Sequence, residues 1–185
     1  MAPQPTFIRD GWLIQAEKRV SANCDTRPDC DDISLLVIHN ISLPPGQFGT
    51  GCIEDFFCNQ LDYQAHPYFG HLQGVEVSAH CLISRKGHIT QFVPFDLRAW
   101  HAGKSCFAGR ERCNDFSIGI ELEGTDNSPY SDEQYDSLTR LARILMADYP
   151  RITRQRIVGH SDIAPDRKTD PGPAFDWSRL QRELL

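Results

Sequence analysis

The sequence has no long hydrophobic run. No stretch approaches the roughly 20 apolar residues that a membrane-spanning helix needs. The first twenty residues, "MAPQPTFIRDGWLIQAEKRV", place Arg9, Asp10 and Glu17 where an export signal would need an unbroken apolar core. These two deficits exclude a membrane-spanning class and favour a cytoplasmic location.

A basic stripe and closely spaced cysteine pairs are lacking as well. The net charge of -6 gives no reason to expect nucleic acid as a partner. It leaves an anionic small substrate open, because an acidic protein can still hold a basic pocket. The pairs Cys24/Cys30 and Cys106/Cys113 are too widely spaced for zinc knuckles. We therefore expect the seven cysteines to be reduced thiols, most of them packed as small apolar residues.

The chain shows no internal repeat, linker or low-complexity segment. Its 185 residues, 40% of them hydrophobic, suffice for one domain with a substantial core. We expect a single domain over residues 1–185, in which residues 1–33 have little periodicity and wrap the domain as an irregular segment.

The hydrophobic patterns that follow predict both strands and helices. Residues 34–40, 116–124 and 156–160 are apolar or alternating runs typical of strands, and residues 77–84 and 88–95 form a hairpin around Gly87. Helices are predicted at 52–61, from the Ser131/Gln134 capping box to Pro150, and at 175–184. This content indicates an α/β fold with a central mixed β-sheet flanked by helices.

Two histidines follow apolar strand runs, and one of them precedes a loop rich in polar residues. His39 comes after "LLVI" and His160 after "RIVG", positions that line the crevice of an open α/β sheet. The segment "VGHSDIAPDRKTDPG" (158–172), too rich in proline and glycine for a helix or strand, carries Asp170. Two imidazoles and one carboxylate are typical of a catalytic zinc site with water as the fourth ligand.

Two further charged residues fit hydrolysis at such a metal. If "KTD" is extended, Lys168 and Asp170 point the same way, so the ammonium would lie beside the metal and stabilise an oxyanion. Glu121, on the alternating strand 116–124, could orient or deprotonate the water.

The residues alone leave alternatives open. The segment 158–172 could be a plain hydrophilic loop, and Glu121 taken alone fits a solvent-facing glutamate. His80 and His101 also lie beside apolar or aromatic residues, so spacing does not choose between them and His39/His160. Residue patterns alone thus indicate a zinc hydrolase as a candidate class, but they do not decide which histidines bind the metal.

Four stretches carry a family resemblance that runs from about residue 10 to residue 180. They are "LLVIHNISLPPGQFG", "VSAHCLISRKGHITQFVPFDLRAWHAG", "GRERCNDFSIGIELEGTD" and "IVGHSDIAPDRKTDPG". Together they resemble AmpD-type 1,6-anhydro-N-acetylmuramoyl-L-alanine amidases, in the zinc amidase superfamily that includes peptidoglycan recognition proteins and phage lysozyme-like amidases. The resemblance implies the fold of that superfamily.

The resemblance also implies roles for single residues. One Zn²⁺ per chain would be held by His39, His160 and Asp170, with Glu121 and Lys168 as catalytic residues. Asn40, Trp100 and Arg112 would line the substrate groove, and His80 and His101 would take supporting or pocket-wall roles. Where relatives have an arginine before "VSAH", this chain has Glu76, so no substrate contact is carried over there.

The implied activity is hydrolysis of the amide between the lactyl group of 1,6-anhydro-N-acetylmuramic acid and L-alanine, in cytoplasmic peptidoglycan recycling. We expect small soluble anhydro-muropeptides as partners, recognised by loops 41–51 and 100–113, and no nucleic acid, membrane or obligatory protein partner. The alternatives are a wall-lytic amidase that acts on intact peptidoglycan and a non-catalytic peptidoglycan-binding receptor. The receptor would need an incomplete zinc set, and here the set is complete.

Overall fold

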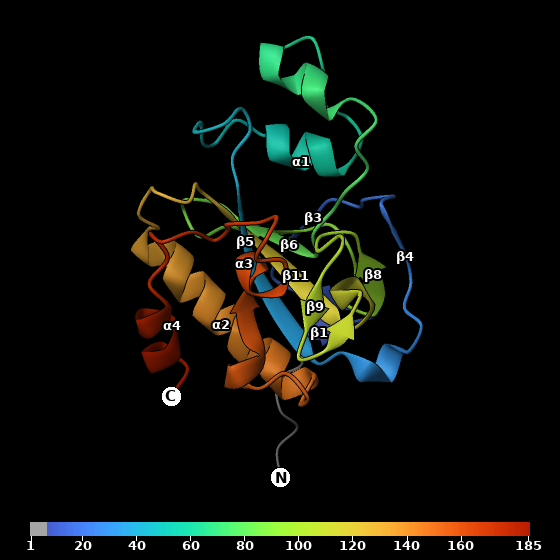
Figure 1. Cartoon of the computed structure of the whole chain (residues 1–185), viewed down its shortest axis with the longest axis vertical. Coiled ribbons are helices and arrows are strands. Elements are labelled where there is room, and N and C mark those ends of the chain that lie inside the picture. The colour runs from blue at the N-terminus through green and yellow to red at the C-terminus, as the bar shows by residue number, and fades with distance from the viewer. Residues whose placement is uncertain (1–6) are drawn as a thin grey trace.

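A six-stranded mixed sheet forms the centre of the protein in the computed structural model, which describes residues 7–185 (Figure 1). In order across the sheet, the strands are β12 (Ile157–Gly159), β5 (Leu35–Ile41), β11 (Ser117–Glu123), β6 (Cys81–Ile83), β7 (Ile89–Gln91) and β3 (Glu17–Lys18). The four strands from β12 to β6 run parallel, β6 and β7 form an antiparallel hairpin, and β3 pairs parallel with β7. The predicted α/β class with a mixed sheet is confirmed, and Gly87 in the hairpin turn has a φ of 76° as expected.

Two helices cover one face of this sheet. Helix α2 (Asp132–Asp148) begins with the predicted Ser131/Gln134 capping box, and α4 (Trp177–Glu183) lies beside it (Figure 1). The main core joins these helices to alternate residues of the sheet: Leu36, Ile38, Ile118, Ile120, Leu122, Leu138, Leu141, Leu145 and Leu180. The apolar residues at every second position of the strands therefore pack against the apolar residues on one side of α2, which recur with the helical period of 3.6.

The opposite face is covered by irregular chain. Leu35 and Val37 of β5 pack against Ala102, Phe116 and Ile163. These partners come from the segment after β8 (Leu97–Ala99) and from the one-turn helix α3 (His160–Ile163). The segment also contains β9 (Cys106–Phe107), β10 (Arg110–Glu111) and the 3-10 helix η3 (Cys113–Asp115). Side chains two or four positions apart on a strand point to the same face of a sheet. His39 therefore points to the same face as Leu35, and Glu121 to the same face as Ser117.

A smaller core lies beyond the β6–β7 hairpin. Helix α1 (Cys52–Phe57) and the 3-10 helix η2 (Pro67–Leu72) stand away from α2 and α4, at the top of Figure 1. Phe56 and Phe57 pack with Phe69 and Phe92 in this second core. The helix predicted over residues 52–61 ends earlier, where Asn59 takes a φ of 57° that an α-helix does not allow.

The N-terminal segment, expected to be irregular over residues 1–33, contains short strands in its described part. These are β1 (Ile8–Arg9), β2 (Trp12–Leu13), β3 at the sheet edge, and β4 (Cys24–Thr26), followed by the 3-10 helix η1 (Cys30–Asp32). Residues 1–6 lie outside the described part. A last 3-10 helix, η4 (Arg154–Arg156), precedes β12. Within residues 7–185, no helix combines the length and apolarity that a membrane crossing requires.

Candidate active site

Strand pairing places His39 and His160 side by side. Strands β5 and β12 are parallel neighbours, and Ile38 pairs with Gly159, so the residues that follow these two, His39 and His160, lie at the same level of the sheet. The Nδ1 atoms of His39 and His160 lie 2.9 Å apart. Both side chains are almost completely buried, at 1% and 3% exposure. The predicted meeting of these two histidines is therefore observed.

Asp170 completes the cluster. Its Oδ2 lies 3.1 Å from Nδ1 of His39 and 3.1 Å from Nδ1 of His160. A tetrahedral ion with ligand bonds of about 2.0–2.1 Å would separate its ligand atoms by roughly 3.3 Å. The three atoms are spaced closely enough to bind one such ion, and the group could hold a metal.

The charge state of the cluster also fits a cation. The carbonyl of Ala102 accepts a hydrogen bond from His160 Nε2, at 3.1 Å, which leaves a lone pair on Nδ1 of the neutral ring. Complete burial lowers the pKa of His39 to about 4, against the opposing effect of Asp170. Burial opposes the charge of Asp170, but the adjacent imidazoles of His160 and His39 hold the pKa of its carboxyl well below its ordinary value. Lone pairs and one negative charge thus converge on one point.

Glu121 lies on the strand next to His39. The two residues are register partners on the parallel strands β11 and β5. Glu121 is 9% exposed, and its Oε2 has no hydrogen-bond partner among the described residues. Burial raises the pKa of its carboxyl well above the ordinary value, and the charge of Asp170 adds to this while Lys168 opposes it. The alternative of a solvent-facing glutamate is wrong, because all seven residues of β11 are buried.

Lys168 directly follows the turn after α3. Its backbone N–H donates to the carbonyl of Ala164 at 2.9 Å, directly after α3. Its charge lowers the pKa of both His39 and Glu121, so the ammonium acts on the cluster.

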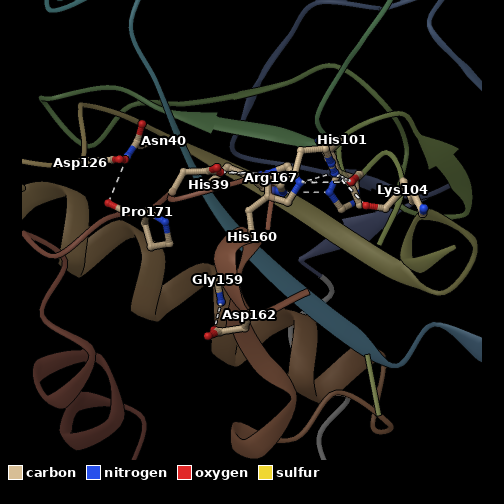
Figure 2. A network of polar contacts seen from close by, with 12 residues as sticks. His39, Asn40, His101, Lys104, Asp126, Gly159, His160, Asp162, Arg167 and Pro171 are labelled. Atoms are coloured by element: carbon tan, nitrogen blue, oxygen red, sulfur yellow. Dashed lines mark hydrogen bonds and ion pairs between the residues drawn. The ribbon is translucent and has the colours of Figure 1, made fainter. Parts of the chain in front are cut away.

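The expectation that residues 158–172 contain no helix is wrong at α3. That turn of helix forms because Asp162 accepts a hydrogen bond from the backbone N–H of Gly159 at 2.7 Å (Figure 2).

The three predicted substrate contacts lie at different depths. Asn40, next to His39, donates to Asp126 Oδ1 at 2.8 Å and to the carbonyl of Pro171 at 3.1 Å, which ties β5 to the turn after Asp170 (Figure 2). Trp100 is half-buried and directly follows β8. The side chain of Arg112 is 72% exposed and lies 3.4 Å from Asp115.

A cavity of about 580 Å³ opens beside α3. It is lined by the cationic side chains of Lys104, Arg112 and Arg167, by Glu111 and Asp166, and by the apolar surface of Ile163. Arg167 Nη2 donates to the carbonyls of Ala102 and Lys104 at 2.6 and 2.9 Å. The Ala102 carbonyl also accepts from His160 Nε2, so Arg167 of the cavity wall and His160 of the cluster share one acceptor (Figure 2).

Sequence reasoning passed over residues that hold this site together. His101, expected only in a supporting or pocket-wall role, is partly buried, and its Nδ1 lies 2.9 Å from His39 Nε2. No sequence pattern indicated a role for Arg167 or Asn114. The strict alternation of residues 116–124 contains Gly119 on the side of Glu121, and a strand glycine often marks the close approach of another group. His80 lies outside the ligand cluster, bonded to Gly119 and Leu97.

Comparison with known proteins gives consistent results. The family described as N-acetylmuramoyl-L-alanine amidase matches residues 29–173, more than half of the chain. The 1,6-anhydro-N-acetylmuramyl-L-alanine amidase AmpD of Escherichia coli is 57% identical over 175 residues, which cover 95% of this chain and 95% of the relative.

Solved structures agree with the sequence relatives. A crystal structure of a selenomethionine derivative of AmpD superposes with a TM-score of 0.94 at 53% identity, covering 97% of this chain and all of that one. The amidase AmiD of Escherichia coli, in complex with the substrate anhydro-N-acetylmuramic acid-L-Ala-D-gamma-Glu-L-Lys, gives a TM-score of 0.61 at 32% identity. That match covers 96% of this chain and 65% of AmiD.

Proposed function

The chain belongs to the N-acetylmuramoyl-L-alanine amidase family, and on that premise we propose that it hydrolyses the lactyl–L-alanine amide of 1,6-anhydro-muropeptides. The observation that carries the proposal is the convergence of His39, His160 and Asp170 beside the buried carboxyl of Glu121, whose Oε2 has no hydrogen-bond partner among the described residues. The AmpD relatives are named for this activity, and one of them matches over 95% of both chains.

We propose that the three converging residues hold one Zn²⁺ per chain. A set of two imidazoles and one carboxylate leaves a fourth position for water or substrate. When bound, zinc would polarise the substrate carbonyl and lower the pKa of a water molecule toward neutrality.

The roles of Glu121 and Lys168 follow from their surroundings. A carboxyl whose pKa is raised by burial can take a proton from the attacking water and return it to the alanine nitrogen. The water oxygen then bonds to the carbonyl carbon, the C–N bond breaks, and the alanine leaves as an amine. The Lys168 ammonium would stabilise the negative charge on the carbonyl oxygen.

We propose that the muropeptide occupies the region between the metal cluster and the 580 Å³ cavity. Arg112, exposed in the cavity wall, is suited to pair with a carboxylate of the stem peptide. Asn40 and Trp100, which flank His39 and His101, are the other proposed contacts. Small fragments suit a cavity of this size, since pockets for small ligands span about 300–1,000 Å³.

A recycling role in the cytoplasm is the biological setting that we propose. All seven cysteines are free thiols in the structure, which favours a reducing compartment. The main rival is a wall-lytic amidase, which would perform the same chemistry on intact peptidoglycan.

One experiment separates these functions. Purified protein should release the stem peptide from an anhydro-muropeptide, detected by mass spectrometry, and a chelator should abolish release. We expect kcat/KM to be higher on the anhydro sugar than on the same peptide carrying reducing muramic acid, and little release from purified sacculi. Zinc should be stoichiometric in the wild type and strongly reduced in Asp170→Ala. Equal rates on both sugars, or efficient digestion of sacculi, would favour the wall-lytic enzyme.

A further inference from the structure

One dipeptide contacts the outer nitrogens of both histidine ligands. His39 Nε2 lies 2.9 Å from Nδ1 of His101, and His160 Nε2 lies 3.1 Å from the carbonyl oxygen of Ala102. Figure 2 shows His101 on the side of His39 away from Asp126, with Arg167 beside it. The two proposed ligands, one on strand β5 and one at the start of α3, therefore both contact adjacent residues of one loop.

The dipeptide is itself firmly anchored. Oδ1 of Asn114 accepts hydrogen bonds from the backbone N–H groups of His101 and Ala102, at 3.2 and 2.8 Å. Arg167 adds a bond to the carbonyl of Ala102 at 2.6 Å. A shift of the backbone of His101 or Ala102 would therefore break a hydrogen bond to Asn114 or Arg167.

The ring of His101 packs against strand β11. It is bonded at the far side, where Nε2 lies 3.0 Å from Oγ of Ser117. On strand β11, a Cβ at Gly119 would overlap the Cγ, Nδ1 and Cδ2 atoms of the His101 ring. The absent side chain at Gly119 thus provides the space that the imidazole fills, between His39 and Ser117.

Hydrogen-bond direction follows from the ligand geometry. His39 turns Nδ1 toward His160 and Asp170, so its proton must be on Nε2 for Nδ1 to bind a metal. That N–H donates to Nδ1 of His101, which places the His101 proton on Nε2, where the Ser117 hydroxyl accepts it. The acceptors fix both the tautomers and the orientations of the metal ligands.

We propose that His101 is a positioning residue for the metal site, and that His101 and Ala102 act as one bracket that orients His39 and His160. This inference rests on the proposed zinc amidase function. Removal of such an outer hydrogen-bond partner typically lowers metal affinity by about 10–100-fold.

The first test compares zinc affinity by competition with a coloured chelator. His101→Leu leaves the buried N–H of His39 without an acceptor, and we expect it to bind zinc about 10–100-fold more weakly. His101→Asn keeps an oxygen near the position of Nδ1, and we expect most of the affinity to return. The Co²⁺ visible spectrum should change in His101→Leu, and KM for the substrate should stay near the wild-type value.

The second test needs no variant. In the zinc-loaded wild type, long-range ¹H–¹⁵N spectra should show His39, His101 and His160 as Nε2–H tautomers. A His101 ring protonated on Nδ1, or a His101→Leu protein with wild-type zinc affinity and Co²⁺ spectrum, would overturn the proposal. A wild-type protein that bound no zinc would instead refute the zinc site itself, so the two failures are distinct.

Discussion

At the scale of single residues, burial decides the chemistry of this site. Glu121 lies on a strand that is buried on both faces, beside the candidate metal site. Its Oε2 has no hydrogen-bond partner among residues 7–185. Lys168 supplies positive charge to the site, since its charge lowers the pKa of Glu121 against the effect of burial. The two side chains oppose each other electrostatically, which suits one for proton transfer and the other for stabilising an anion.

These roles predict that chemistry and binding can be separated by mutation. Lys168→Ala should keep zinc and bind the muropeptide but lose about 10²–10³ in kcat, because an oxyanion donor acts mainly in the transition state. Glu121→Ala should behave similarly. Steady-state kinetics and metal analysis check both, with Lys86→Ala, in the exposed hairpin turn, as the matched control. Near-normal turnover in Lys168→Ala would remove that residue from the mechanism.

At the scale of elements, helix α2 is connected to the ends of two strands by one side chain. Gln134 Nε2 donates to the carbonyls of Ile83 and Glu123, at 3.2 and 2.9 Å. Its Oε1 accepts from the backbone N–H of Ser131 at 3.1 Å, as part of the capping box. Gln134 is completely buried, so the cap also satisfies the carbonyls where β6 and β11 end.

Two substitutions at this cap should therefore differ in cost. Ser131→Ala removes one capping bond and should lower the free energy of unfolding by about 1 kcal/mol. Gln134→Ala removes the reciprocal bond and leaves two strand carbonyls unsatisfied, each at about 1–3 kcal/mol, so it should cost more. Urea unfolding measures both, and Glu133→Ala at an exposed neighbouring position should cost least. A Gln134→Ala protein as stable as Ser131→Ala would show that water replaces the lost bonds.

At the scale of the whole molecule, the fold encloses three histidines that stay uncharged. Burial lowers the pKa values of His39, His80 and His101, and for His80 the Arg27 guanidinium adds to the effect. Nη2 of Arg27 lies 3.0 Å from His80 Nε2, and Gly119 N–H donates to the other ring nitrogen at 3.0 Å. His80 belongs to the layer under the site and not to the metal cluster.

This burial predicts how stability depends on pH. Below the ordinary histidine pKa of 6.5, the unfolded chain binds a proton at His80 that the folded protein excludes. Stability is therefore fully present above pH 6.5 and falls as pH drops below it, by up to about 1.4 kcal/mol per pH unit for this one proton. His80→Asn should unfold more easily overall but show a shallower loss between pH 6.5 and 5. Urea titrations at a series of pH values test this, and an unchanged slope would refute it.

The sequence by itself determined the main strands and the long helix of this protein and pointed to the residues that converge in the candidate metal site. Local patterns were sufficient for β5, β11 and α2, because the alternation of Ile118, Ile120 and Leu122 and the capping box at Ser131 are recorded in neighbouring residues. The pairing of His39 with His160 was suggested by their places after apolar runs, although family resemblance was needed to prefer them over His80 and His101.

Only the tertiary structure decided how deeply these groups are buried and what lies behind them. The alternating strand left the environment of Glu121 open, since the chain that covers that face comes from residues 100–116 and 160–163, which carry no local signal for it. The bracket of His101 and Ala102 depends on Asn114, Ser117 and Gly119, which meet it only when the loop folds back over β11. Contacts between residues distant along the chain are set by packing, and packing is a property of the whole fold.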